Sequence, residues 1–230
     1  MKTKDSVSRK IKAALSGVCL MSCMLLAPAA PAMAEAAELS LPRPQIAAGM
    51  SVMQALEKRQ TSRSFGAAAL SPSQLSHILW AANGINRPES DGRTNPAALG
   101  VHSVEVYVVT ADGIFLYLPK THALQPVAEG DFRMTTTKGQ PFVGEAPLTL
   151  VYVGSSAAWE NARRVPSGDR QLLYDSIAAG AMTQSVALTA AAEGLGTCVR
   201  ASVDEDAFGE AAHLQDDQTI LLAQTLGVLP

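Results

Sequence analysis

The chain has 230 residues, of which 47% are hydrophobic, and its 18 basic and 21 acidic side chains give a formal net charge of −3 at pH 7. A chain with this acidic balance lacks the basic face that nucleic acids and anionic membranes require, so we expect neither as a partner. Its length suffices for one sizeable hydrophobic core, and no internal repeat divides it, so a single domain is the simplest arrangement.

The N-terminus has the layout of a secretory signal peptide. Basic residues within the first 12 positions precede an uncharged run at 13–27, and residues 32–34 (Ala-Met-Ala) supply a cleavage site. The run is too short for a comfortable membrane span. We therefore predict a signal peptide at 1–34, a domain at 35–230, and a periplasmic or secreted protein. A lipoprotein that carries its lipid on Cys23 is the alternative.

Removal of the signal peptide would make the chain more acidic. It would leave 13 basic and 20 acidic side chains, a net charge of −7. It would also leave Cys198 as the single cysteine, so no intrachain disulfide bond could form. We expect Cys198 to be a packed small residue and not a redox thiol.

The rest of the chain shows helix and strand signals in an α+β order. Ser51 and Ser71 have the features of helix N-caps, and Gly84 and Gly194 those of helix stops. The predicted elements, in chain order, are a short helix at 51–58, a helix at 71–84, a strand hairpin of 103–109 and 113–118, a strand at 148–153, a long helix at 171–193, a short helix at 204–214 and a strand at 219–228.

The long helix at 171–193 is apolar nearly all the way round. A helix with this pattern is typical of the middle of a protein or of an oligomer interface. Before it, the loop at 155–169 is a candidate substrate lid, with Trp159, Arg163 and Arg164; a mobile surface loop is the alternative.

Several common catalytic motifs are missing from the sequence. The four histidines show no paired metal spacing, and neither a G-x-S-x-G motif nor a phosphate-binding P-loop occurs. The stretch GLGTC at 194–198 has two glycines but lacks the third glycine of a dinucleotide-binding loop, and it follows a helix instead of a strand. We therefore nominate no catalytic side chain and no metal site.

One basic cluster stands out against the acidic chain. In EKRQTSRSF, at 57–65, Arg59 and Arg63 enclose Gln60 and Thr61. Guanidinium, amide and hydroxyl groups in this arrangement can hold a phosphate through charge-assisted hydrogen bonds. The alternative is a solvated turn at the end of a helix, where basic side chains complement the helix dipole.

Motifs along nearly the whole chain after the signal peptide resemble those of the nitroreductase superfamily of flavin enzymes. EKRQTSRSF resembles the opening motif of that family, and the stretches LSPSQLSHILWAANGINRP and RTNPAALGVHSVEVYVV resemble its second helix, active-site loop and first strand. Later landmarks, including EGLGTCVR and QTLGVLP, are similar to those of a short branch related to azoline-oxidising dehydrogenases. The resemblance implies an α+β three-layer sandwich, with a mixed, mostly antiparallel sheet surrounded by helices, in a homodimer with flavins at the interface.

The resemblance also implies FMN as cofactor. The family's opening motif holds the FMN phosphate, and backbone at the end of its central helix packs against the flavin edge. The family's active-site loop, which reaches the partner subunit's flavin, departs from the usual pattern here, because alanine and glycine replace its polar residues. The positions that this carries over are Arg59, Gln60, Thr61 and Arg63 for the phosphate, Ala97, Ala98 and Gly100 in the loop, Gln184 in the long helix, and Glu193, Gly194, Leu195 and Gly196 at the flavin edge.

The function implied is an exported FMN-dependent oxidoreductase that transfers electrons to a small acceptor such as a quinone or a nitro compound. Reductant and acceptor would visit the same flavin face in turn, and an electron-donor protein is a candidate partner because nicotinamide cofactors are scarce outside the cytoplasm. Two alternatives remain open. One is a binding protein of the same fold that has lost turnover, and the other is a dehydrogenase that acts on a modified peptide.

Overall fold

A computed structural model of the chain describes residues 37–46 and 49–230. The predicted signal peptide at 1–34 and the lipid-carrying alternative at Cys23 lie outside these residues. No helix within the described ranges is long and apolar enough to cross a membrane.

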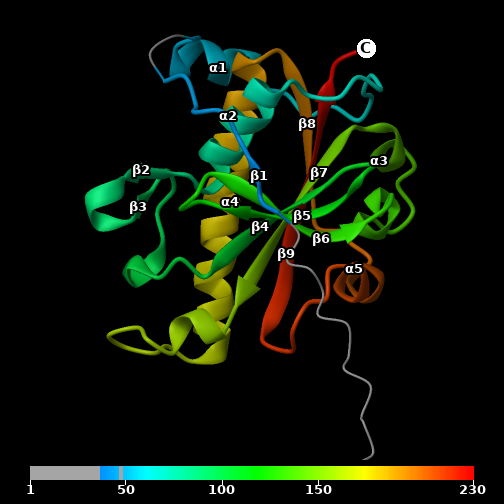
Figure 1. Ribbon diagram of the computed structural model, residues 1–230. Helices are drawn as coiled ribbons and strands as arrows, with labels where there is room; N and C mark the ends of the chain where they lie inside the picture. The colour runs from blue at the N-terminus through cyan, green and yellow to red at the C-terminus, as the bar shows by residue number, and fades with distance from the viewer. Residues whose placement is uncertain (1–36, 47–48) are drawn as a thin grey trace, which may run out of the picture. The chain divides into compact units, whose positions relative to one another are not determined.

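Seven strands form one sheet (Figure 1), in the order β1-β6-β5-β4-β7-β9-β8. All pairings between neighbouring strands are antiparallel, and an isolated parallel bridge joins Thr61 to Thr197, so the expected mostly antiparallel sheet is confirmed. The strands of this sheet are β1 (Leu39–Ser40), β4 (Val104–Val109), β5 (Gly113–Leu118), β6 (Ala123–Glu129), β7 (Leu148–Ser155), β8 (Leu195–Arg200) and β9 (Gln218–Val228). A second, two-stranded sheet pairs β2 (Ile85–Arg87) with β3 (Gly92–Arg93).

Helices cover both faces of the large sheet, which confirms the expected α+β sandwich (Figure 1). The α-helices are α1 (Val52–Lys58), α2 (Pro72–Asn83), α3 (Phe142–Glu145), α4 (Gly168–Ala192) and α5 (Glu205–Ala211). Short 3₁₀ turns occur in the connections between elements, at η1 (Pro88–Ser90), η2 (Ala98–Gly100), η3 (Arg133–Thr136) and η4 (Ala157–Trp159).

The two faces of the sheet bury two separate cores because side chains alternate along each strand. On β4, Val106 and Val108 belong to the core shared with α2 and α4. Tyr107 and Val109 belong to the core on the other face, which includes Phe208 of α5. The ring of Tyr107 meets that of Phe208 edge to face, with centroids 6.0 Å apart. The middle layer of the sandwich is therefore buried on both sides.

The predicted hairpin of β4 and β5 is present, and the final strand and both capped helices lie where the sequence predicts them. The side chains of Ser51 and Ser71 each accept a hydrogen bond from the backbone N–H three residues later, in complete capping boxes. The prediction did not include β6 and β8. Strand β6 contains Pro126, which reads as a strand breaker, but β1 pairs only with the start of β6, so the proline lies where the strand is effectively an edge.

The long helix α4 carries one side into the core and leaves another exposed. Ala178, Ala179 and Val186 are buried, whereas Leu173 and Ile177 are 45% and 60% exposed. The sequence predicted a helix that is apolar on nearly all sides. Within the single chain, only some of the apolar side chains of this helix are buried. The exposed part is available to another surface.

Candidate functional site

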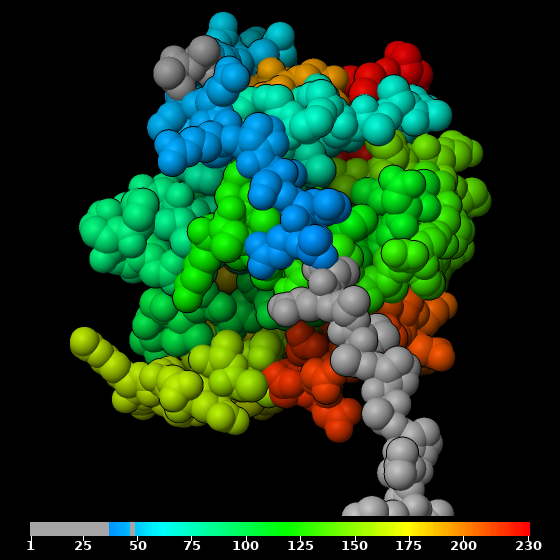
Figure 2. All heavy atoms as spheres, viewed as in Figure 1, coloured from blue at the N-terminus to red at the C-terminus, as the bar shows by residue number. Residues whose placement is uncertain are grey.

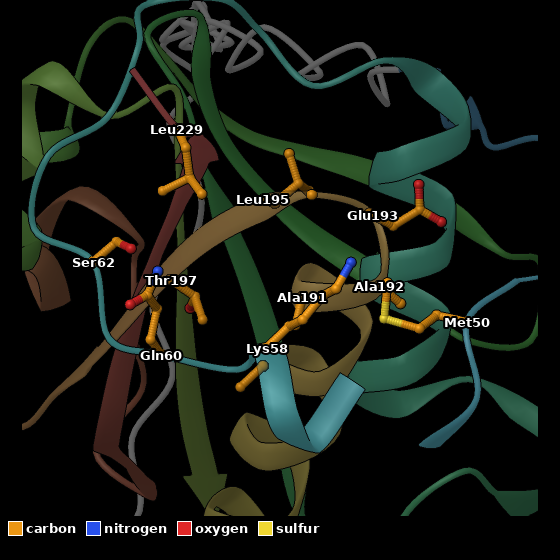
Figure 3. Close-up of a pocket in the computed structure, with 12 residues that line it drawn as sticks. Met50, Lys58, Gln60, Ser62, Ala191, Ala192, Glu193, Leu195, Thr197 and Leu229 are labelled. Carbon is orange, nitrogen blue, oxygen red and sulfur yellow. The ribbon is translucent and has the colours of Figure 1, made fainter. Parts of the chain in front are cut away.

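A pocket of 530 Å³ lies where α1, the end of α4, the start of β8 and the end of the chain meet. Figure 3 shows Gln60, Ser62 and Thr197 along one side of it and Met50, Ala192 and Glu193 along the opposite side. The complete lining is Met50, Lys58, Gln60, Ser62, Ala187, Ala191, Ala192, Glu193, Gly194, Leu195, Thr197 and Leu229. The alanines, the leucines and Met50 give the pocket an apolar wall, and its remaining side chains, which are those of Lys58, Gln60, Ser62, Glu193 and Thr197, give it a polar rim.

The segment after α1 is held against β8 by its backbone. The Ser62 N–H donates to the Thr197 carbonyl at 2.9 Å, next to the parallel bridge between Thr61 and Thr197. Gln60 and Ser62 line the pocket, as alternate residues of an extended segment do, and Lys58 at the end of α1 lines it as well. The basic motif of the sequence therefore lies at the pocket, as an added edge of β8.

Two glycines shape the turn from α4 into β8. Gly194 has φ +71°, in the left-handed region, where a residue without Cβ is favoured. At Gly196 the backbone is packed so closely that an added Cβ would lie 2.7 Å from Cδ2 of Leu229 and 2.9 Å from Cβ of Ser62. The sequence predicted a sharp helix stop here. It did not predict that a strand begins immediately after Gly194.

The basic side chains of the motif are Lys58, Arg59 and Arg63. Among the residues that the structure describes, none of Lys58, Arg59 and Arg63 forms a salt bridge. Arg59 is half-buried, whereas Lys58 and Arg63 are exposed. Three cations within six positions of an acidic chain are therefore free to attract an anion.

The structure brings together part of the site that the sequence predicted. Gln60, Glu193, Gly194 and Leu195 line the pocket. The remaining predicted positions are absent from its lining, and their binding roles stay predictions. They are Arg59, Thr61 and Arg63 in the alternate positions of the extended segment, Gly196 behind Ser62, Gln184 on an exposed part of α4, and Ala97, Ala98 and Gly100 in and beside η2.

The loop with Ala97 lies beside the middle of α4, where Ser185 donates to Asn95 at 2.5 Å. Gln184 is exposed in the single chain, so it does not satisfy a buried polar partner there. In the single chain, the loop with Ala97 and the side chain of Gln184 therefore lie outside the pocket lining.

The candidate lid at 155–169 cannot cover this pocket within one chain. It precedes the first turn of α4, whereas the pocket lies at the last turns, and 25 helical residues separate the two ends by roughly 37 Å. Trp159 is also not a free lid residue, because its side chain is 1% exposed. The indole is anchored in the core by Asp175 of α4.

Sequence reasoning missed several contributors to the site, and three of them come from distant parts of the chain. Met50 and Leu229 lie near opposite ends of the described sequence, yet both line the pocket. Nothing in the sequence around either residue indicates that it belongs to a site. His77, in α2, places its Nδ1 atom 2.7 Å from Oε1 of Glu193. The sequence signal for His77 is weak. The residue precedes Ile78, which is buried, so its side chain is expected at the boundary of the core.

Cys198 is 1% exposed and packs with Phe65 and Ala146, as the sequence predicted for a small core residue.

Comparison with known proteins places these features in a family. The sequence matches the group described as the Nitroreductase family over residues 56–228. A Methanocaldococcus jannaschii protein with a provisional nitroreductase name is 28% identical over 176 residues, which cover 73% of this chain and 86% of the relative.

Solved structures show the same fold. A provisionally named nitroreductase from Ralstonia eutropha JMP134 superposes with a TM-score of 0.78 and 34% identity, covering 84% of this chain and 90% of that one. A provisionally named nitroreductase from Desulfovibrio desulfuricans, solved in complex with FMN, superposes with a TM-score of 0.55 and 20% identity, covering 78% and 87%. At that identity the second likeness concerns the fold alone.

Proposed function

The chain belongs to the nitroreductase family of oxidoreductases, and from that premise we propose that it is an exported FMN-dependent enzyme that passes electrons to a small acceptor, such as a quinone or a nitro compound. The observation that carries this proposal is the pocket at the end of α4. An apolar wall meets Lys58 there, and Arg59 and Arg63 belong to the adjoining segment after α1. None of these three cations forms a salt bridge within the described chain.

The residues present fit a flavin mononucleotide. Ala187, Ala191 and Leu195 offer a flat ring an apolar surface, and the pocket's 530 Å³ lies within the range of small-molecule sites. Gly194 presents backbone without a Cβ, which allows a ring to approach closely. Arg59 and Arg63 would hold the phosphate, since charge-assisted hydrogen bonds are the strong ones.

FMN would supply the electron and hydride transfer chemistry. The FMN in the Desulfovibrio desulfuricans structure supports this choice of cofactor. The chain's own residues would bind and orient the cofactor and acceptor, and we assign no side chain as acid or base.

The proposal includes a homodimer. Leu173 and Ile177 on α4 are exposed, as are Met53 and Leu56 on the neighbouring α1. A second copy that covered these side chains would also bring its own loop with Ala97 towards the pocket, as the family resemblance implies. Apolar area of this kind is typical of an interface between identical subunits.

Export rests on the N-terminal signal layout, and the electron donor is then proposed to be a protein instead of a nicotinamide. The test of localisation is fractionation of cells that express the full chain. Retention of an uncleaved chain in the cytoplasm would contradict export without affecting the cofactor proposal.

The test of the cofactor is the visible absorption spectrum of residues 35–230 after incubation with FMN and desalting. We expect retained flavin bands in the wild type, and their loss in an Arg59→Ala plus Arg63→Ala double variant. The matched control is Arg163→Ala plus Arg164→Ala, which removes two exposed arginines before α4 and should leave binding intact.

A folded wild type that stays colourless at high FMN would overturn the enzyme proposal. It would favour the binding-protein alternative, for which the absence of polar side chains at Ala97, Ala98 and Gly100 is the supporting observation. Retained FMN without turnover of quinones or nitro compounds would leave the modified-peptide alternative to be tested.

A further inference from the structure

The side chain of His77 joins the pocket to a segment that precedes the family match. Its Nδ1 lies 2.7 Å from Oε1 of Glu193, on the pocket wall, and its Nε2 lies 3.0 Å from the backbone nitrogen of Gln45. Gln45 belongs to residues 39–46, which we call the N-terminal strap. The strap lies on the surface of the molecule (Figure 2) and outside the matched residues 56–228.

These two contacts define the protonation of the imidazole. A backbone N–H can only donate, so Nε2 of His77 must accept from Gln45 and carries no proton. The proton of the neutral ring is then on Nδ1, which donates to Glu193 Oε1. The distance of 2.7 Å would also suit an ion pair. A protonated ring would leave the Gln45 N–H facing another donor, and we therefore infer the neutral form.

The hydrogen bond uses only one oxygen of the carboxylate. Within the described chain, Oε1 of Glu193 has His77 as its partner, and Oε2 has no hydrogen-bond partner. The Glu193 side chain is 28% exposed and belongs to the pocket lining, whereas the His77 side chain behind it is 16% exposed. A ligand in the pocket could therefore donate to Oε2 while His77 fixes the other oxygen.

The strap has several backbone anchors. Strand β1 pairs with the start of β6, and the Ser76 hydroxyl donates to the Pro42 carbonyl at 2.6 Å. His77, the next residue on α2, adds the anchor at Gln45. Past the strap, Met50 is part of the pocket wall.

We propose that His77 is a positioning residue for the pocket. Through Nδ1 it holds the Glu193 carboxylate on the wall, with one oxygen left for a hydrogen-bond donor of the bound ligand, and through Nε2 it fastens the strap to α2. The proposal goes beyond the family assignment, and it rests on the proposed function only in taking FMN as the occupant.

The first test needs no cofactor. Long-range proton–nitrogen NMR spectra of the ligand-free domain at pH 8 report which ring nitrogen of His77 is protonated. We expect a neutral ring with its proton on Nδ1. A proton on Nε2, or on both nitrogens, would overturn the proposal.

Two conservative variants separate the two contacts. The amide of asparagine lies near the Nδ1 position of histidine, so His77→Asn should keep a donor to Glu193 and release Gln45. The longer glutamine reaches the Nε2 position, so His77→Gln should keep an acceptor for Gln45 and release Glu193. Amide exchange at Gln45 should then be at least tenfold faster in the Asn variant than in the Gln variant. Equal exchange rates in the two variants would contradict the strap contact.

The FMN-loaded domain provides the readout at the pocket. A fixed carboxylate on the wall disfavours electron uptake by the occupant. We expect Glu193→Gln to raise the midpoint potential of bound FMN by a tenfold change in the equilibrium, which is about 30 mV for a two-electron couple. His77→Gln should shift the potential in the same direction, because it releases the carboxylate from its fixed position. His77→Asn should stay close to the wild type.

If bound FMN has the same midpoint potential in His77→Asn and His77→Gln, then His77 has only a structural role. That result would overturn the proposed positioning role. A wild type that binds no FMN would instead defeat the proposed function. The NMR measurement would still decide whether His77 holds Glu193.

Discussion

The indole Nε1 of Trp159 donates to Oδ1 of Asp175 at 3.2 Å, and both side chains are buried. Ser103 donates to the same carboxylate oxygen from the residue before β4. One carboxylate thus connects the turn η4, the helix α4 and the sheet, at the end of α4 opposite the pocket. Buried polar groups are stabilising only while each has its partners.

We expect Asp175→Ala to lower the free energy of unfolding by about 2 to 4 kcal/mol, because it leaves two buried donors without an acceptor. Urea denaturation of the ligand-free domain measures the change. The control is Asp216→Ala, which removes an exposed carboxylate and should change the unfolding free energy by less than about 0.5 kcal/mol. Equal effects of the two variants would show that the buried contacts contribute nothing specific.

The same carboxylate should make stability depend on pH. Burial raises the pKa of Asp175, against the opposing effect of the hydrogen bonds from Ser103 and Trp159. Between the ordinary value of 3.8 and the higher pKa of the folded state, the native chain keeps a proton that the unfolded chain releases. The contribution of this group to stability is therefore present below pH 3.8 and is lost as the pH rises through the folded pKa.

Asp175→Asn removes this titration while it keeps an acceptor for Trp159. We expect the unfolding free energy of the wild type to fall relative to that of the Asn variant as the pH rises from about 4, by at most about 1.36 kcal/mol per pH unit. Urea titrations of both proteins across pH 4 to 8 give the difference directly. A wild-type unfolding free energy that instead rises relative to that of the Asn variant would mean that the hydrogen bonds outweigh burial and that the pKa is lowered.

The sequence predicted the fold where local patterns are strong. Runs of strand-forming residues predicted β4, β5 and β7, and the capping residues Ser51 and Ser71 predicted where α1 and α2 begin. Strand β8 was missed because its pairing with β9 is a contact between distant segments, and local propensity carries little information about such contacts.

The candidate site likewise contains residues that could be predicted from the sequence and residues that could not. Glu193 and Gly194 could be named from a family motif, and both line the pocket. Met50, His77 and Leu229 could not, because each reaches the site only through the tertiary arrangement of the strap, α2 and the end of the chain. The arginines of the basic motif could be named because a basic cluster stands out in an acidic chain.

Gly196 should not tolerate a side chain. The Cβ of Gly196→Ala would lie 2.7 Å from Cδ2 of Leu229 and 2.9 Å from Cβ of Ser62, so we expect a loss of about 1 to 3 kcal/mol in unfolding free energy from overpacking. Combining it with Leu229→Ala should recover part of the loss, because the closest contact is then removed. Thermal and urea denaturation of the single and double variants measure both effects.

Gly209→Ala is the matched control for that substitution. Gly209 lies in α5, has no atom within 4 Å of its added Cβ, and has a backbone without a positive φ. We expect it to stabilise the domain by about 0.4 to 1 kcal/mol, since alanine restricts the unfolded chain more than glycine does. A destabilising Gly209→Ala would show that the effect at Gly196 is not due to crowding alone.

The proposed dimer can be tested at Ile177, whose side chain is 60% exposed in the single chain. If a second copy covers the outer side of α4, Ile177→Glu places a carboxylate in that apolar contact without a partner, and an unpaired buried charge is strongly unfavourable. We expect the dimer to dissociate, with an increase in the dimer dissociation constant of at least about 100-fold, which corresponds to about 2.7 kcal/mol. Sedimentation velocity over a range of protein concentrations measures it.

Val165→Glu is the control, because Val165 is 54% exposed but lies in the loop before α4 and not on the helix. It should leave the dimer intact. The single-chain fold of Ile177→Glu should also be intact, since an exposed position has no core contact to lose, and circular dichroism checks this. A wild type that sediments as a monomer, or an Ile177→Glu variant that still sediments as a dimer, would remove α4 from the interface. The loop with Ala97 would then have to be assigned a role within its own chain.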